Sequence, residues 1–330
     1  MVYRAAVIGC GKIGSEFSDD PKVKDIYTHI EAYRACPDTE LVAVCDIDRK
    51  KLDSCGNKWS IQLRYTDYRK MIDEINPDII SICTPDPTHY PIIRSILESS
   101  DIKAVFAEKP LAGTVHEAEE LVRVARQKQI LLAVNYSRRY STCFIQLKKA
   151  LQSGSFGGVQ AVSGYYTKGT LNNGTHWIDL ARFLVGEIVN VHGYDVIRED
   201  GTDPSLDLRM EFAHGAVGYL HACDATKFSI FEMDIIGSRA RVCIRDSGHS
   251  VEIYSVGEST YYSGYKSLIH DTVYAHCMND MIVHAVEDIT ECIRTGKTPR
   301  CSGEDGLKAM TIASMARESA ASNLVRIAGR

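Results

Sequence analysis

The sequence has no long hydrophobic run, no basic excess and no low-complexity segment. Its apolar runs fall well short of the roughly 20 residues that a membrane-spanning helix needs. A formal net charge of -5, from 38 basic and 43 acidic residues, provides no positive field for a phosphate backbone. The first residues, MVYRAAVIG, lack the charged and then apolar layout of a secretory signal. We therefore expect a soluble, cytoplasmic protein that binds neither membranes nor nucleic acid.

Cysteine is present, but the spacing typical of metal sites is missing. None of the eleven cysteines belongs to a Cys-x-x-Cys pair. Several lie in apolar, strand-like runs such as LVAVC and IISIC, as reduced core residues do. We expect neither a metal site nor a disulfide framework.

The composition is that of a globular protein, because 45% of the 330 residues are hydrophobic and 25% are charged, enough for two domains. In residues 1–135, strand-like apolar runs alternate with helix-like segments, which predicts a parallel sheet and one domain. The helix after Thr114 begins with a capping-box pattern that ends at Glu117. The predicted strands are Arg4–Ile8, Leu41–Cys45, Gln62–Tyr65, Ile79–Cys83, Ala104–Ala107 and Leu131–Val134.

In residues 136–330 the pattern changes to short strands joined by turns, which predicts a mostly antiparallel sheet. Two helices are expected to close the chain, one over residues 280–294 and one opened by Ser302-x-x-Asp305. The last helix can pack back on the first domain. The strand candidates are VQAVSGYYTKG, VNVHGYDVI, LDLRMEF, AVGYLHAC, FEMDIIG, ARVCIRD and SVEIYSV.

A glycine motif follows the first predicted strand and indicates a dinucleotide site. Gly9, Gly11 and Gly14 have the G-x-G-x-x-G spacing that allows a tight turn, approach of a pyrophosphate and close helix packing. Asp46 ends the next strand, where a carboxylate accepts both ribose hydroxyls and repels a 2′-phosphate. NAD is therefore favoured over NADP, although Arg49 is placed to accommodate a phosphate.

The distance from glycine motif to Asp46 exceeds the usual spacing of about 20 residues. The extra length is the run Ser15–Thr28, which carries acids, lysines and one proline. It must lie near the ligand-binding edge of the sheet. A lid over the ligands and a solvated loop are equally consistent with this sequence.

Several short stretches together resemble one known family. They are GCGKIG, CTP, EKP, GTHWIDL and SGEDGLKAM, which extend nearly from end to end of the chain. On these the chain resembles the glucose-fructose oxidoreductase, inositol dehydrogenase and MocA family of NAD(P)-dependent oxidoreductases. The resemblance implies an α/β fold with an N-terminal Rossmann domain, then a C-terminal α+β domain on a mostly antiparallel open sheet. It also implies a homo-oligomer, a dimer or tetramer, formed through the second domain.

The resemblance implies that Lys109 lies beside the nicotinamide and the substrate hydroxyl. A cation there stabilises the alkoxide that develops as hydride leaves. Glu108 is a plausible partner that orients the ammonium group, whereas His89 is expected to be structural. The expected cofactor neighbours are Gly9, Gly11, Lys12, Ile13, Gly14, Asp46, Thr84, Pro85, Glu108 and Lys109.

The segment THWIDLARFLVG reads as an amphipathic helix with histidine and aspartate at the border of its buried face. His176 and Asp179 are three residues apart and so are neighbours on one face. In a purely structural interpretation, Asp179 complements the helix dipole and Asn173 or Thr175 caps the helix. The core stripe is predicted to be Trp177, Leu180, Ala181, Leu184 and Val185.

The family resemblance assigns His176 to catalysis, as the group that takes the hydroxyl proton. Asp179 then orients the imidazole or contacts the substrate directly. Asn172 departs from the family pattern, in which an aspartate is common four residues before the histidine. An amide cannot act as a general base, although it can bind sugar hydroxyls. We therefore expect His176 and Lys109 to take the proton of the substrate hydroxyl.

Further substrate-side candidates are Arg138 and Arg139 after the sixth strand, and Tyr165 in the second domain. One arginine is expected to bind a hydroxyl-rich or phosphorylated substrate, and an interdomain salt bridge is an equal alternative. The leading hypothesis is an NAD-dependent dehydrogenase or ketoreductase for a secondary alcohol of a sugar, polyol or sugar derivative. The alternatives are a non-catalytic NAD-binding sensor, and a reductase of a non-sugar carbonyl or imine.

Overall fold

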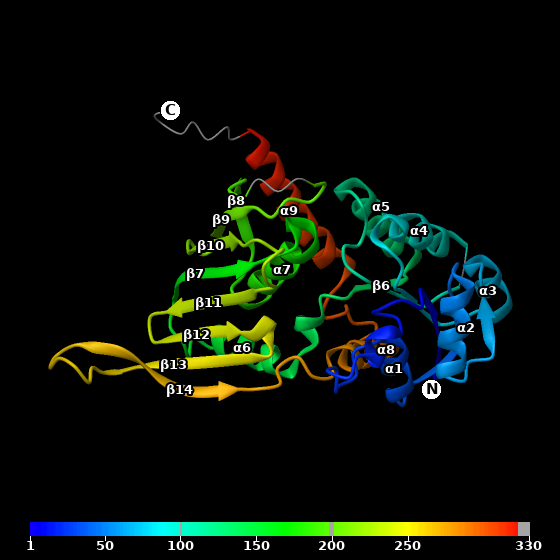
Figure 1. Ribbon diagram of the computed structural model, residues 1–330, viewed down its shortest axis with the longest axis horizontal. Helices are drawn as coiled ribbons and strands as arrows, with labels where there is room; N and C mark the ends of the chain where they lie inside the picture. Colours follow the sequence, from blue (N-terminus) through cyan, green and yellow to red (C-terminus); the bar gives the residue numbers. More distant parts are fainter. Residues whose placement is uncertain (100, 198–200, 323–330) are drawn as a thin grey trace. The chain divides into compact units, whose positions relative to one another are not determined.

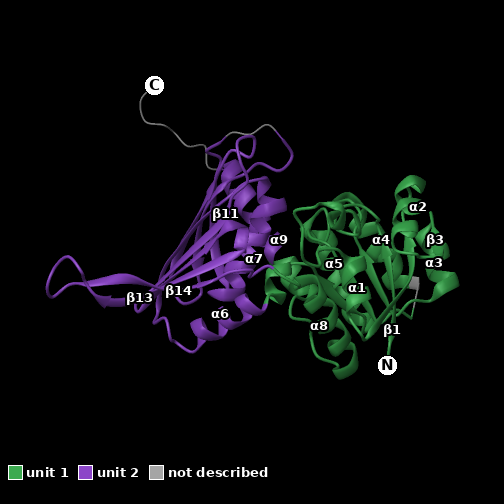
Figure 2. Ribbon diagram, turned by 60° about the horizontal axis from the view of Figure 1, so that its bottom comes forward, with its two compact units in different colours: residues 1–141, 279–308 green, residues 142–278, 309–330 purple. Residues whose placement is uncertain are grey.

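The computed structural model describes residues 1–99, 101–197 and 201–322, which fold as two compact units (Figure 2). The first unit comprises residues 1–141 and 279–308, and the second comprises residues 142–278 and the chain from 309 on. Residues 279–308, which we expected in the second domain, therefore belong to the first unit. They contain helix α8 (Met281–Thr295), which packs against helix α1 (His29–Ala35).

A parallel sheet of six strands forms the centre of the first unit, in the order β3-β2-β1-β4-β5-β6. Its edge strand β6 is labelled in Figure 1. All six predicted strands are confirmed. β1 pairs with both β2 and β4, so the strand order reverses at β1, and ligands bind at the carboxyl ends beside such a reversal. The strands are β1 (Tyr3–Ile8), β2 (Thr39–Cys45), β3 (Leu63–Tyr65), β4 (Ile79–Ile82), β5 (Ala104–Ala107) and β6 (Leu131–Val134).

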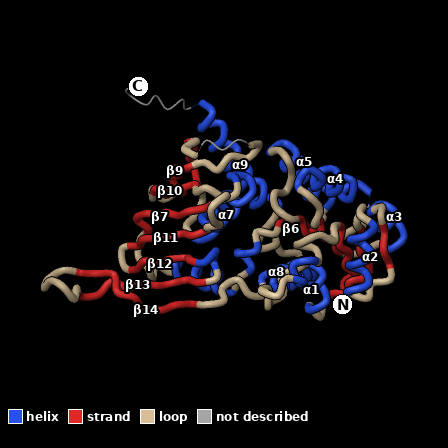
Figure 3. Tube along the Cα trace, viewed as in Figure 1, coloured by secondary structure: helices blue, strands red, loops and turns tan. Residues whose placement is uncertain are grey.

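Helices and short 3-10 segments connect these strands (Figure 3). The predicted capping box of Thr114 and Glu117 is present, and so is that of Ser302 and Asp305. A third one, of Thr28 and Glu31, begins α1. Besides α1 and α8, the helical segments of this unit are η1 (Glu16–Asp19), α2 (Arg49–Lys58), α3 (Tyr68–Ile75), η2 (Asp86–Thr88), α4 (His89–Ser99), α5 (Val115–Lys128) and η3 (Ser137–Tyr140).

The insertion Ser15–Thr28 is fastened to the end of α2. The Trp59 indole donates a hydrogen bond to Ser15 Oγ at 2.9 Å, and the Lys58 ammonium donates one to Ser18 Oγ at 2.6 Å. Farther along, the Phe17 ring meets Tyr27 edge to face, with centroids 5.7 Å apart. Side chains thus hold the beginning and the end of the segment, whereas residues 19–22, 24 and 25 in its middle are exposed.

An eight-stranded sheet forms the second unit, in the order β14-β13-β12-β11-β7-β10-β9-β8. Only β7 and β10 run parallel, so the predicted mostly antiparallel sheet is confirmed. β14 was not predicted, because its sequence KSLIHDTVY mixes polar and apolar residues without alternation and is mostly exposed. The strands are β7 (Val159–Tyr166), β8 (Ile188–Tyr194), β9 (Asp207–Phe212), β10 (Val217–Ala222), β11 (Phe231–Gly237), β12 (Ala240–Arg245), β13 (Ser250–Glu258) and β14 (Lys266–Tyr274).

Helix α7 (Thr175–Leu184) packs on this sheet through Trp177, which is fully buried. The Trp177 indole donates a hydrogen bond to the Glu232 carbonyl on β11 at 2.9 Å. It fits because Gly164 on β7 has no side chain, and an added Cβ would lie 2.4 Å from Trp177 Nε1. Helix α6 (Thr142–Gln152) also belongs to this unit, and α9 (Gly303–Ser322) begins in the first unit. No helix among the described residues is both long and apolar enough to cross a bilayer.

The expectation that every cysteine is reduced was wrong for one pair. Cys143 and Cys277, both in the second unit, form a disulfide with their Cα atoms 5.3 Å apart. The other nine cysteines are free, and most of them are buried. The two bonded residues are 134 positions apart, so no local spacing in the sequence could have predicted the pair.

Candidate active site

The glycine turn after β1 has the geometry that its spacing predicts. Gly9 has a φ of +103°, and a Cβ there would lie 2.5 Å from the Cys83 carbonyl oxygen. A Cβ on Gly14 would lie 2.1 Å from the Gly9 carbonyl oxygen. At Gly11, by contrast, an added Cβ meets no atom within 4 Å. Gly9 and Gly14 therefore serve chain packing, whereas Gly11 leaves open space where a pyrophosphate can approach the backbone.

Asp46, directly after β2, is held in place by two backbone donors. Its Oδ2 accepts the Cys10 N–H at 2.7 Å, and its Oδ1 accepts the Asp48 N–H at 2.8 Å. Each carboxylate oxygen keeps a second lone pair for a ribose hydroxyl. Arg49, the residue that could have accommodated a 2′-phosphate, instead pairs with Asp53 along α2 at 3.1 Å. The arrangement favours NAD.

A cavity of about 840 Å³ lies against this turn and the ends of β1, β2 and β4. Its volume is in the range of cofactor sites, and the glycine turn and Asp46 fit the pyrophosphate and ribose of a dinucleotide. Phe17 of the insertion also contributes to its wall. The predicted cofactor neighbours that line it are Gly9, Gly11, Lys12, Ile13, Asp46, Thr84 and Pro85. Gly14, Glu108 and Lys109, which were also predicted, are not among the residues that line it.

Glu108 and Lys109 follow β5, the strand next to β4, at the same edge of the sheet. The Oε1 of Glu108, the residue expected to orient Lys109, accepts hydrogen bonds from His29 Nε2 at 2.9 Å and Asn135 Nδ2 at 2.6 Å. Burial would raise the pKa of the Glu108 carboxyl, yet these bonds and the charge of Lys109 hold it below its ordinary value. Lys109 is half-buried, and its peptide bond to Pro110 is cis.

His29 was missed at the level of sequence, although a signal for it exists. Thr28-x-x-Glu31 has capping-box spacing, which marks His29 as the first residue of a helix directly after the insertion. His89 was predicted to be structural, and this is confirmed. It is fully buried, with Nδ1 2.7 Å from the Pro110 carbonyl and Nε2 2.8 Å from the Thr84 carbonyl.

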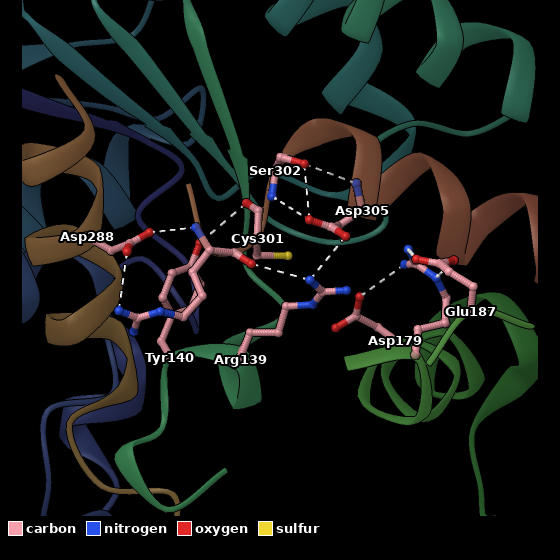
Figure 4. A network of polar contacts seen from close by, with 10 residues as sticks. Arg139, Tyr140, Asp179, Glu187, Asp288, Cys301, Ser302 and Asp305 are labelled. Atoms are coloured by element: carbon pink, nitrogen blue, oxygen red, sulfur yellow. Dashed lines mark hydrogen bonds and ion pairs between the residues drawn. The ribbon is translucent and has the colours of Figure 1, made fainter. Parts of the chain in front are cut away.

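In the second unit, α7 carries the predicted His176 and Asp179. His176 is half-buried, whereas Asp179 is almost fully buried, with Arg182 NH1 3.7 Å from its Oδ1. Arg182, which the sequence did not single out, also holds both carboxylate oxygens of Glu187 at 3.0 Å (Figure 4). Arg182 thus contacts the carboxylate of Asp179, which lies one helical turn from His176.

The start of α7 differs from the capped helix that we considered. The helix continues from a π-helical turn, η4 (Gly169–Gly174), and no side chain caps it. The Asn173 amide donates to the Thr167 carbonyl at 2.9 Å, and the Thr175 hydroxyl donates to the Leu171 carbonyl at 2.7 Å. Both candidate caps were therefore wrong, because a helix that continues backwards has few free N–H groups to cap.

Asp203 fixes the backbone of the π-helical turn. Its two carboxylate oxygens accept the Leu171 N–H at 2.8 Å and the Asn172 N–H at 2.9 Å. Asn172 itself is exposed. The turn thus holds the backbone of Asn172 rigidly in the segment that leads into His176.

The remaining predicted substrate residues lie in different surroundings. Arg139 is buried and pairs with Asp305 at 3.1 Å within the first unit, so it takes the salt-bridge alternative, though not between domains (Figure 4). Arg138 beside it is partly exposed. Tyr165 is exposed on β7, whereas its neighbours Gly164 and Tyr166 are buried. Since Gly164 faces α7, Tyr165 points to the other face of the sheet, and the structure does not bring it beside His176.

Two family models match the chain. The oxidoreductase family with an NAD-binding Rossmann fold matches residues 3–136, and the C-terminal alpha/beta domain of the same family matches residues 151–326. Myo-inositol 2-dehydrogenase of Thermotoga maritima is 22% identical, over 96% of each chain. Inositol 2-dehydrogenase of Rhizobium meliloti is 25% identical, over 97% of this chain and 98% of the relative.

Solved structures show the same fold. Levoglucosan dehydrogenase, in a complex with NADH and levoglucosan, has a TM-score of 0.82 at 18% identity, with 98% of each chain covered. Because the two family models together span both units, the chain belongs to the Gfo/Idh/MocA oxidoreductase family, whose N-terminal domain is an NAD-binding Rossmann fold.

Proposed function

We propose that the chain is an NAD-dependent dehydrogenase or ketoreductase that acts on a secondary alcohol of a sugar, polyol or sugar derivative. The observation that carries the proposal is the cavity at the reversal of strand order, which Asp46 lines. Lys109 follows β5, the strand next to β4, at the same edge of the sheet. Relatives that act on inositol, apiose and glucosides support this substrate class. When bound, NAD supplies the hydride acceptor.

We assign the handling of the hydroxyl proton to Lys109 and His176. Oxidation of an alcohol releases a proton as the hydride leaves, and both side chains can hold a proton near neutral pH when suitably placed. His176 is half-buried, so its ring can reach both solvent and ligand. Asp179 lies one helical turn away on the same helix, and Arg182 contacts its carboxylate.

Substrate binding is assigned to Asn172 and Arg138. Both are at least partly exposed, and the backbone of Asn172 is held by Asp203. An amide donates to and accepts from sugar hydroxyls, whereas a guanidinium favours hydroxyl-rich or phosphorylated ligands. We keep Arg139 and Tyr165 out of this set for the geometric reasons given above.

The test is cofactor reduction across a panel of polyols and sugars. The panel contains inositol isomers, apiose, glucosides, levoglucosan and nucleotide-linked sugars, and NADH formation is followed by absorbance. We expect turnover with at least one member, and a loss of at least about 100-fold in kcat for Lys109→Met and for His176→Ala. Lys128→Met, an exposed position near the end of α5, is the matched control.

Two results would point to the alternatives. NAD binding without turnover of any panel member favours a non-catalytic sensor, since a sensor has no use for Lys109 or His176. Turnover of a non-sugar ketone or imine alone favours a family reductase with another substrate. No NAD binding at all refutes the proposal.

We also propose that the chain is a cytoplasmic homo-oligomer that associates through the outer face of the second unit's sheet. This face exposes several large apolar side chains at 41% to 50% of their surface. They are Tyr165 on β7, Tyr219 on β10, and Leu268 and Val273 on β14, which the strand register places on the same face. Light scattering tests the assembly, with Tyr219→Glu expected to dissociate it, and cell fractionation tests the location.

A further inference from the structure

Two fully buried histidines bracket the turn that carries Lys109. His29, the first residue of α1, has Nε2 2.9 Å from Glu108 Oε1. His89, the first residue of α4, has Nδ1 2.7 Å from the Pro110 carbonyl. Each ring therefore holds a residue directly next to Lys109 in the chain, one before it and one after it.

The contacts of His29 form a continuous chain of hydrogen bonds. A carboxylate can only accept, so Nε2 of His29 carries the hydrogen that binds Glu108. Nδ1 of His29 lies 2.8 Å from Ser81 Oγ, and Ser81 Oγ lies 2.7 Å from the Tyr33 hydroxyl oxygen. His29, Ser81 and Tyr33 are all fully buried, and the polar side-chain atoms of all three have hydrogen-bond partners. Such a satisfied network rigidifies its members.

Asn135 is a second hydrogen-bond donor to Glu108. The Asn135 amide donates to the same Oε1 at 2.6 Å and is itself buried. Its own Oδ1 is buried with no hydrogen-bond partner among the described residues. Two donors on one oxygen fix the carboxylate in position, so the backbone that leads to Lys109 starts from a fixed point.

His89 connects the other side of the turn to the cofactor cavity. Its Nε2 lies 2.8 Å from the carbonyl of Thr84, a residue that lines the cavity. A displacement of His89 therefore moves the Lys109 turn through Pro110 and the cofactor turn through Thr84. Both partners are carbonyl oxygens, which can only accept, so His89 bonds both at once when both ring nitrogens carry hydrogen and otherwise bonds one of them.

We propose that His29 and His89 are positioning residues for the reaction: they hold Glu108 and Pro110 so that Lys109 meets the substrate in one orientation. The inference rests on the proposed function, in which Lys109 handles the hydroxyl proton. Neither histidine touches the substrate. Each acts through the hydrogen bond that it gives to the turn.

The test exploits the shapes of asparagine and glutamine, which mimic the two ring nitrogens. An asparagine amide reaches the place of Nδ1, and a glutamine amide reaches that of Nε2. His29→Gln therefore keeps a donor for Glu108, whereas His29→Asn leaves the carboxylate without it. Both variants lose similar packing, so their melting temperatures should fall alike. We expect kcat to fall at least about tenfold in His29→Asn and less than about threefold in His29→Gln, with the Kd for NAD unchanged.

At His89 the preference reverses, which provides the matched control. His89→Asn keeps the bond to Pro110, and His89→Gln keeps the bond to Thr84. We expect His89→Gln to lose kcat with little change in the Kd for NAD, and His89→Asn to weaken NAD binding with kcat nearly retained. The inference is overturned if the asparagine and glutamine variants have the same kcat and the same Kd for NAD at either position. It is also overturned if the decrease in kcat across the four variants is proportional to the decrease in melting temperature.

A second measurement needs no substrate and so separates this inference from the proposed function. The rate at which an amine-reactive reagent modifies Lys109 is followed by peptide mass spectrometry, with the exposed Lys128 as internal reference. We expect modification of Lys109 to speed up at least threefold in His29→Asn and His89→Gln, relative to the wild type. Unchanged rates in both variants overturn the positioning role, even if the wild-type chain oxidises sugars. If the wild-type chain turns over no sugar, the proposed function fails while the rates still decide the positioning role.

Discussion

Alanine at Gly9 and at Gly11 should have opposite consequences, although both belong to the same motif. At Gly9 the positive φ costs a residue with a side chain about 1–2 kcal/mol. The new Cβ would lie 2.5 Å from the Cys83 carbonyl oxygen, and relieving that overlap costs roughly 1–3 kcal/mol more. In a unit of this size, each kcal/mol of destabilisation lowers Tm by roughly 2–4 °C. Gly9→Ala should therefore lower Tm by about 5–15 °C.

Gly11→Ala should leave the unliganded fold intact. The added methyl group meets no atom within 4 Å, and alanine loses less chain entropy on folding than glycine. We expect an unchanged or slightly raised Tm. The methyl group fills the space that a pyrophosphate needs, so at least one charge-assisted hydrogen bond to the turn is lost, about 1.5–3 kcal/mol. The Kd for NAD should therefore rise roughly 10-fold to 100-fold.

Calorimetry provides both measurements, thermal unfolding without ligand and titration with NAD. The reasoning is refuted if Gly11→Ala binds NAD like the wild type, because the open space would then not be the pyrophosphate site. It is equally refuted if Gly11→Ala unfolds at a lower temperature than Gly9→Ala.

Four further predictions follow from contacts described above. Asp46→Ser should weaken NAD binding about 10-fold to 100-fold and NADP binding less, since the carboxylate that repels a 2′-phosphate is gone; titration with both cofactors measures the ratio. Asp179→Asn should lower the free energy of unfolding by roughly 2–4 kcal/mol, because Arg182 loses a buried partner, and denaturant titration detects this. Cys143→Ser should cost about 2–4 kcal/mol in the same assay, an effect that vanishes when the wild type is reduced. The contacts of Glu108 lower the pKa of its carboxyl, so the carboxylate stabilises the fold at neutral pH. This contribution is lost as the pH falls below the ordinary carboxyl range. In Glu108→Gln the free energy of unfolding, measured by denaturant titration at several pH values, should therefore fall less steeply with acid.

The first unit could be predicted well because its signals are local. Each strand is a short apolar run bounded by a turn, and the glycine motif and Asp46 follow strands at fixed positions. The carboxyl ends of parallel strands share one edge, so residues that follow different strands converge there without further information. The capping boxes at Thr114 and Ser302 were predictable for the same reason.

What escaped prediction depends on contacts between distant residues. The bond between His29 and Glu108 spans 79 residues, and the disulfide spans 134. Arg182 was overlooked because an arginine in a helix is usually exposed, whereas here it is buried between two acids. β14 lacked an alternating pattern because it is the edge strand of the sheet, with no neighbour beyond it.

The insertion Ser15–Thr28 leaves the sheet and returns to almost the same point. The N–H of His29 donates to the Ile13 carbonyl at 3.1 Å, and the N–H of Ile30 donates to the Gly14 carbonyl at 3.2 Å. The two ends of the insertion are thus joined by backbone bonds that do not depend on what lies between them. A reporter domain placed in its exposed middle, near Lys22, would therefore sit beside the dinucleotide cavity without lengthening the path from the glycine turn to His29. Because Phe17 of the same segment lines that cavity, we expect a fluorophore in such a fusion to report whether the site is occupied.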